Sequence, residues 1–273
     1  MNRFGRLRLV AWHVFKESVR DRVLYAIAGF AALIVAATLL IGRITAGEDV
    51  KIIKDFGLAT IELAGMLITI FIGVGLIARE IDRRSIVGLL AKPLPRWEFV
   101  VGKYLGLVLT MAVNVAAMAA ALYLVLAYLD WGAVPAERAS WEAAALDPRL
   151  LLAVLMIQAE LALLTAVALF FSTFSSSALL SIVFTVGILV AGLFSEDLRR
   201  FGDIVDVSPA VALVVGLVGW IVPAFSAFDV KAQIVHGQTL PPGFVPYTLG
   251  YAALYVGALL VASVAAFSRR EFT

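Results

Sequence analysis

The chain has 273 residues, of which 62% are hydrophobic and only 15% are charged, and its mean hydropathy is +0.99. A soluble domain would carry about 25% charged residues, so the composition predicts an integral membrane protein of the all-α class, with one transmembrane domain over residues 1–273. The absence of cysteine excludes disulfides and thiol chemistry. The two histidines, His13 and His236, are too few for a histidine-based metal centre, and no metal site is expected.

Residues 1–22 alternate six Arg and Lys residues with apolar residues at helical spacing. This pattern predicts an amphipathic helix that lies in the membrane interface. Apolar segments that suit spanning helices of about 20 residues follow along the chain. The six expected spans are Val23–Gly42, Gly57–Ala78, Phe99–Tyr128, Arg149–Phe171, Ala178–Phe194 and Phe244–Phe267. Polar loops are expected at Arg43–Phe56 and Leu129–Pro148, and a short tail at 268–273.

The segment 195–243 is harder to assign. Its apolar stretch, Pro209–Ala224, is short for a full span and contains glycines and Pro223. We therefore expect re-entrant external helices between the fifth and sixth spans. The alternative is a seventh span, which would move the C-terminus across the membrane.

The distribution of charge predicts the orientation. With six spans, one side of the membrane receives residues 1–22 and 79–103, the serine-rich turn at Ser172–Ser177 and the tail. This side holds 14 of the 22 basic residues but six of the 20 acidic ones. Because Arg and Lys are enriched on the cytoplasmic side, both termini and the 79–103 segment are expected in the cytoplasm.

The loop 79–98 concentrates charge between two apolar spans. If this loop is helical, one face would carry Ile81, Ser85, Ile86, Leu89 and Leu90. The charged side chains of Glu80, Asp82, Arg83 and Arg84 would face the solvent. Pro93 and Pro95 then end this helix. A short surface helix of this kind could dock on a soluble partner through its charges. The alternative is a topogenic loop whose positive charges only fix orientation.

The run from Arg79 to Gly106, REIDRRSIVGLLAKPLPRWEFVVGKYLG, resembles the first cytoplasmic loop of ABC-2 type permeases, the membrane subunits of ABC transporters. The Ser172–Ser177 turn, the end of the fifth span and the segment Val222–Gly237 are similar to the corresponding parts of that family, so the resemblance covers nearly the whole chain.

The resemblance implies a coupling helix around Glu80–Leu90 that sits on a separate ATPase, with Glu80, Asp82, Arg83, Arg84, Ser85 and Leu89 as the coupling residues. It further implies two copies of this chain around a central pathway and two ATPase subunits, which would bind the ATP and Mg²⁺. Export across a bacterial or archaeal inner membrane is the expected activity, with the lipid bilayer but no nucleic acid as a further partner.

Four polar residues are expected at membrane depth, where charged groups are costly and often functional. They are Glu62, Asn114, Gln158 and Glu160. Glu62 lies about one and a half turns into its predicted span and is expected near the outer interface. Glu160 lies nearer the middle of its span and is a candidate for transport or proton coupling. The other interpretation is that Glu160 is protonated or hydrogen-bonded within the bundle, with Gln158 or Asn114 as its partner.

No nucleotide-binding motif of the G-x-x-x-x-G-K-[ST] kind and no set of catalytic residues occurs in the sequence, so the chain is expected to be non-catalytic. One alternative function is an ion- or proton-coupled transporter or channel that works without an ATPase and uses Glu160 and Glu62. An intramembrane enzyme lacks a nucleophile, and a membrane scaffold remains a further alternative.

Overall fold

The computed structural model describes residues 3–19, 28–29, 32, 35–36, 49–82, 95–139, 141, 143–175, 177–205 and 208–269. These residues form helices joined by short connections, and no strand occurs among them. The predicted all-α class is therefore confirmed. The first predicted span, Val23–Gly42, lies almost entirely outside the described residues.

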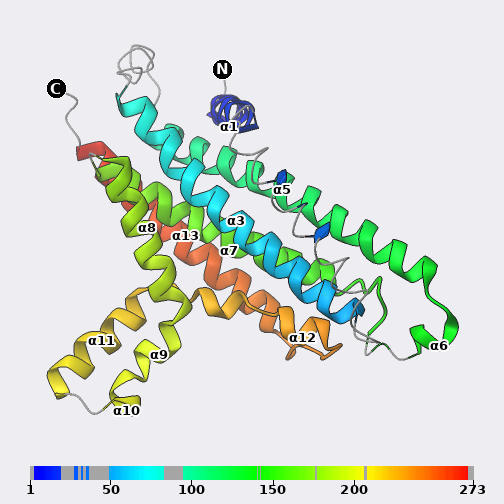
Figure 1. Cartoon of the computed structure of the whole chain (residues 1–273). Coiled ribbons are helices and arrows are strands. Elements are labelled where there is room, and N and C mark those ends of the chain that lie inside the picture. The colour runs from blue at the N-terminus through cyan, green and yellow to red at the C-terminus, as the bar shows by residue number, and fades with distance from the viewer. Residues whose placement is uncertain are drawn as a thin grey trace.

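Four long helices run side by side as the body of the bundle (Figure 1). Their bounds are α3 Asp49–Asp82, α5 Arg96–Gly132, α7 Leu150–Phe174 and α13 Phe244–Arg269. Each is long and apolar enough to cross a membrane, and they correspond to the predicted second, third, fourth and sixth spans. The fifth predicted span is α8, Ala178–Leu193, an apolar helix of 16 residues.

The start of α3 corrects the sequence prediction. Residues from Asp49 onward, which were expected to belong to a polar loop, are already helical. Their polar side chains find partners there, and one example is Lys54, which is 1% exposed and donates to the carbonyl oxygen of Ala144 at 2.6 Å. The loop that contains Ala144 covers the start of α3. The charged first turns of α3 can therefore be helical and partly buried.

The long helices run between two ends of the bundle. One end, here called the α1 end, holds α1 (Arg3–Val19), the last turn of α3, the first turn of α5 and the last turns of α7 and α13 (Figure 1). The opposite end, here called the α6 end, holds the start of α3, α6 (Pro135–Arg138) and the starts of α7 and α13. The segments with excess positive charge therefore border the same end of the bundle.

Helix α1 packs against α5 through two glycines. An added Cβ at Gly102 would lie 2.7 Å from Val10, and one at Gly106 would lie 2.6 Å from the Ala11 carbonyl oxygen. Val14 of α1 is buried among residues of α3 and α5. The predicted N-terminal helix is present, and its contact with α5 needs residues without a side chain at these positions.

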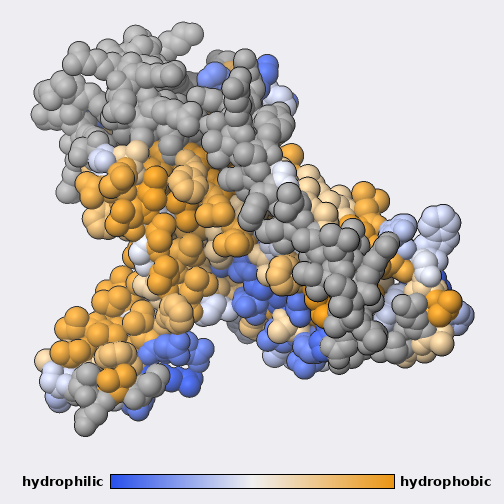
Figure 2. Space-filling view, in the orientation of Figure 1, coloured by the Kyte–Doolittle hydropathy of each residue, from blue (hydrophilic) through white to orange (hydrophobic). Residues whose placement is uncertain are grey.

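The segment between α8 and α13 is made of short pieces. They are α9 (Ser195–Arg199), α10 (Phe201–Ile204), α11 (Pro209–Ile221), the 3₁₀ turn η1 (Phe225–Phe228) and α12 (Lys231–Val235). Helices α9, α10 and α11 project from the bundle as a hairpin in which α11 is apolar and α9 is charged, while η1 and α12 return to contact α3 and α7 (Figures 1 and 2). The 43° bend between α11 and the η1–α12 segment marks either a broken span or a re-entrant loop.

The seating of η1 fixes where α12 begins. Phe225 and Phe228 are each 1% exposed, and Phe225 packs so closely on Gly192 of α8 that a Cβ there would lie 2.4 Å from its ring. The backbone amide of Ala224 donates to the Tyr251 hydroxyl of α13 at 2.9 Å. These contacts bring the residues that follow, 229–235, against α3 and α7.

Candidate functional site

Helix α3 carries a polar stripe on the side that faces α12. Lys51, Asp55, Glu62 and Thr69 follow one another at spacings of four, seven and seven residues, which place them on one helical face. The charges of His236, Asp229 and Lys231 act on Asp55, so the α12 segment lies across this face. In Figure 2, hydrophilic side chains gather beside α12 between apolar surfaces.

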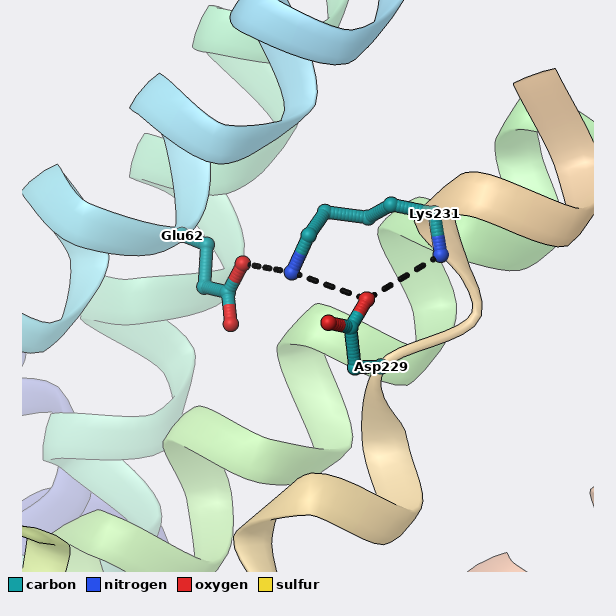
Figure 3. A network of polar contacts seen from close by, with 3 residues as sticks. All are labelled: Glu62, Asp229 and Lys231. Atoms are coloured by element: carbon teal, nitrogen blue, oxygen red, sulfur yellow. Dashed lines mark hydrogen bonds and ion pairs between the residues drawn. The ribbon is translucent and has the colours of Figure 1, made fainter. Parts of the chain in front are cut away.

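Lys231 of α12 contacts the α3 stripe at Glu62 and forms a group of three charged side chains with Glu62 and Asp229. Its ammonium nitrogen contacts Oε2 of Glu62 and lies 3.1 Å from Oδ1 of Asp229 (Figure 3). The backbone amide of Lys231 also donates to the same Asp229 oxygen, at 3.3 Å. Asp229 therefore positions the first residue of α12, and Lys231 connects that helix to α3.

The Glu62 and Lys231 side chains are 14% and 16% exposed, so the pair is largely shielded, whereas Asp229 is 56% exposed. A shielded pair of this kind has given up most of its hydration, and removing one partner leaves an uncompensated charge.

Glu160 on α7 is a further buried carboxyl group in this part of the bundle. It is 2% exposed, and its Oε1 atom has no hydrogen-bond partner among the described residues. The charges that act on it are those of Glu62, Lys231 and Asp229. We refer to Glu62, Glu160, Asp229 and Lys231 as the charge cluster.

The charge cluster corrects two sequence-based expectations. Glu62 was expected near the membrane interface, but α3 begins at Asp49, so Glu62 lies at the middle of the apolar stretch Val50–Val74. Neither Gln158 nor Asn114 is hydrogen-bonded to Glu160. The Asn114 amide donates to the Thr110 carbonyl of its own helix at 2.8 Å, and the Gln158 amide has no hydrogen-bond partner among the described residues.

Sequence reasoning missed Lys231 and Asp229. Both fall in the segment whose fold was ambiguous, and neither lies in a predicted span. A lysine and an aspartate two residues apart, between apolar residues, could have indicated a polar element held inside the bundle, but nothing in the sequence pairs them with Glu62, 169 positions away.

Two of the predicted coupling residues, Glu80 and Asp82, lie at the α1 end. The backbones of Glu80 and Asp82 form the last turn of α3, while Arg83, Arg84, Ser85 and Leu89 lie outside the described residues. The chain resumes at Pro95, and Arg96 at the start of α5 donates to the carbonyl oxygens of Phe267 and Ser268 at 2.9 and 2.6 Å. The two ends of the predicted coupling loop are thus the ends of α3 and α5.

Comparison with known protein families identifies the family to which the chain belongs. The family model for ABC-2 family transporter proteins matches residues 8–269, which is nearly the whole chain. The chain belongs to the ABC-2 transporter family. A search of curated proteins found no matching relative.

Membership in the ABC-2 family confirms the resemblance that the loop motif indicated. It makes the chain a multi-pass membrane protein and a permease component of an ABC transporter. Permeases of this family are generally non-catalytic and generally work with ABC ATPase subunits. Within the described residues, no group of three or more metal-ligating side chains could hold a metal ion.

Proposed function

We propose that this chain is the membrane subunit of an ATP-driven exporter, in which two copies form the pathway and two separate ATPase subunits bind ATP and Mg²⁺. Membership in the ABC-2 family is the observation that carries the proposal. The complete chain would have six spans, with both termini in the cytoplasm of a bacterial or archaeal cell and the α6 end outside.

The coupling site would lie at the α1 end, where residues 79–98 join α3 to α5. Glu80, Asp82, Arg83, Arg84, Ser85 and Leu89 would contact the ATPase. The excess of positive charge in the segments that border this end supports a cytoplasmic location. Helix α1 would lie in the cytoplasmic interface beside the same loop, where its exposed Arg8 and Trp12 suit lipid headgroups and the membrane boundary.

Contacts around Arg96 support a route for movement from this loop into the bundle. Arg96 lies in the last part of this loop, at the first residue of α5, and donates to the carbonyl oxygens of Phe267 and Ser268 near the end of α13. Phe99, one turn later, stacks on Phe267 with ring centroids 5.6 Å apart. A displacement of the loop would therefore move the start of α5 and the end of α13 together.

The experiment is affinity purification of the tagged chain from its native membrane in mild detergent, followed by mass spectrometry and an ATPase assay. A stoichiometric ABC ATPase is the expected partner. The charge reversals Glu80→Lys, Asp82→Lys and Arg83→Glu should release it or uncouple hydrolysis from transport. The control is Glu196→Lys in α9, at the opposite side of the molecule. It breaks an exposed ion pair with Arg200 and should retain the partner.

An ion- or proton-coupled transporter that needs no ATPase is the second candidate function. The observation that favours it is the charge cluster near mid-span. A purified oligomer of this chain alone, with no ATPase and with transport that depends on Glu160, would favour that function and contradict the first.

A further inference from the structure

The hairpin formed by α9, α10 and α11 has one apolar face. Large exposed side chains recur at helical spacing along one side of α11, and all of them are apolar. They are Leu213, Val214, Leu217, Trp220 and Ile221. The opposite side of α11 packs on the other two helices. A Cβ added to Gly219 would lie 2.9 Å from the backbone nitrogen of Arg199, and one added to Gly202 would lie 2.8 Å from the Cβ of Ala212.

The other face of the hairpin is charged. Its exposed side chains on α9 and α10 are Glu196, Asp197, Arg200 and Asp203. Figure 2 shows the apolar surface of α11 beside the hydrophilic surface of α9. Charged groups in hydrocarbon are costly, whereas an apolar helix face is stable there. The hairpin therefore fits the boundary between hydrocarbon and water, with α11 toward the hydrocarbon.

Two tyrosines of α13 place the end of α11 at membrane depth. The Tyr255 hydroxyl donates to the carbonyl oxygen of Ile221, and the Tyr251 hydroxyl accepts from the amide of Ala224. Both tyrosines lie in the first half of a spanning helix, toward the α6 end. The 13 residues of α11 extend only about 20 Å, against roughly 30 Å of hydrocarbon. Because the hairpin also projects sideways from the bundle (Figure 1), α11 fits within one leaflet.

Arg199 lies where the two faces of the hairpin meet. Its Nε atom donates to the carbonyl oxygen of Gly219 at 2.9 Å, and its guanidinium carbon lies 4.6 Å from the centre of the Trp220 ring. Within the described part of the chain, its two terminal nitrogens have no hydrogen-bond partner. Arg200, by contrast, is paired with Glu196. A guanidinium held in this way can donate two parallel hydrogen bonds to a phosphate group.

We propose that the hairpin binds phospholipid of the leaflet at the α6 end, with acyl chains against the apolar face of α11 and the lipid phosphate at Arg199. Trp220 supports the guanidinium at headgroup level, where tryptophan is enriched. The charged face of α9 and α10 is directed to headgroups and water. A second copy of the chain would cover the apolar face but would leave the terminal nitrogens of Arg199 without an anion. The lipid contact does not depend on the proposed ATPase or on the direction of transport.

Spin labels in proteoliposomes test the two faces, because the chain has no native cysteine. A nitroxide at Leu217→Cys should collide often with oxygen and rarely with a water-soluble nickel chelate. A nitroxide at Asp203→Cys is the matched control on the charged face and should show the opposite pattern. Ready access of the nickel chelate to Leu217→Cys would place α11 in water and overturn the proposal. Exclusion of both reagents with spin–spin broadening would show a second copy there and would also overturn it.

Brominated lipids test the phosphate contact by quenching Trp220. This residue is one of five tryptophans, so its signal is the wild-type emission minus that of Trp220→Phe. Dibrominated phosphatidylcholine should quench several-fold more than dibrominated diacylglycerol, which has the same chains and no phosphate. Arg199→Gln should abolish this preference, and Arg200→Gln is the matched control that should keep it.

Equal quenching of Trp220 by the two lipids in the wild type would contradict the phosphate contact. A preference that survives Arg199→Gln would assign the phosphate to another group and overturn the role of Arg199. Soluble glycerophosphate should not reduce quenching by the phospholipid. Competition by glycerophosphate would show a site for free phosphate, and the assignment to lipid would be wrong.

Discussion

Lys231 at the start of α12 is paired with Glu62 in the middle of α3, across 169 positions of sequence. The rest of α12 is apolar on the same side, with Ile234 and Val235 exposed by 2% and 1%. The ion pair and these two side chains together hold a five-residue helix against the bundle. A helix of this length has no stability of its own, so its position depends on these contacts.

We expect Lys231→Met to loosen α12, because Glu62 then keeps a shielded charge without its partner. Breaking a buried pair from one side costs about 3–5 kcal/mol, and partial exposure reduces this to about 2 kcal/mol here. The chain has no native cysteine, so a single Ile234→Cys reports the release of α12 by maleimide labelling. A change of about 2 kcal/mol corresponds to an increase in labelling rate of about 30-fold.

The matched control for this experiment is the double variant Lys231→Met with Glu62→Gln. It removes both charges, so it should label more slowly than Lys231→Met alone. A cysteine at exposed Ala232 should label at the same rate in all backgrounds. Equal rates for Ile234→Cys in the presence and absence of Lys231 would show that the pair does not hold α12.

We expect Gly192→Ala also to loosen α12, in this case by disturbing the contact between η1 and α8. The added Cβ would lie 2.4 Å from both the Pro223 carbonyl oxygen and the Phe225 ring, so η1 must move away from α8. Overpacking of this kind costs about 1–3 kcal/mol. The Ile234→Cys labelling rate should rise, although α12 itself is unchanged. Gly187→Ala on the same helix meets no atom within 4 Å and should leave the rate as it was.

The long helices were predictable because their signal is local. Apolar runs near 20 residues gave α5, α7 and α13 to within a few residues, since in a membrane each helix satisfies its own backbone hydrogen bonds. The start of α3 was missed for the same reason. Lys54 and Asp55 look like loop residues until the carbonyl oxygens of Ala143 and Ala144, 89 and 90 positions later, cover Lys54.

Only two of the four members of the charge cluster could be predicted from the sequence. Glu160 and Glu62 stand out in apolar segments, because a carboxyl group at membrane depth is costly. Lys231 and Asp229 do not stand out, because they lie in a segment of short helices. Their position depends on the packing of Phe225 against Gly192, a contact between side chains that no periodicity records.

The contact between α1 and α5 gives a further prediction. Gly106→Ala would place a Cβ 2.6 Å from the Ala11 carbonyl oxygen and 2.7 Å from Val14, so α1 must move off α5. We expect a loss of about 1–3 kcal/mol and faster proteolytic release of the N-terminal segment. Gly250→Ala on α13, with open space around it, should be neutral or stabilising by up to about 1 kcal/mol. Equal proteolysis of the two variants would contradict this contact.

Arg96→Ala tests the connection between the loop 79–98 and the last helix. The substitution removes two hydrogen bonds from a guanidinium group to the carbonyl oxygens of Phe267 and Ser268, which should cost about 1–3 kcal/mol because one bond is solvent-exposed. If the loop moves α13 through this contact, ATP hydrolysis by the assembled transporter continues while transport falls several-fold.

The transport rate of Arg96→Lys should lie between those of the wild type and Arg96→Ala, because an ammonium group does not reproduce the fixed fork of a guanidinium. Arg200→Ala, which breaks an exposed ion pair with Glu196 of α9, should leave both activities unchanged. A proportional fall of hydrolysis and transport in Arg96→Ala would instead indicate that Arg96 serves assembly or stability, and coupling would then run through α3 or α5 without α13.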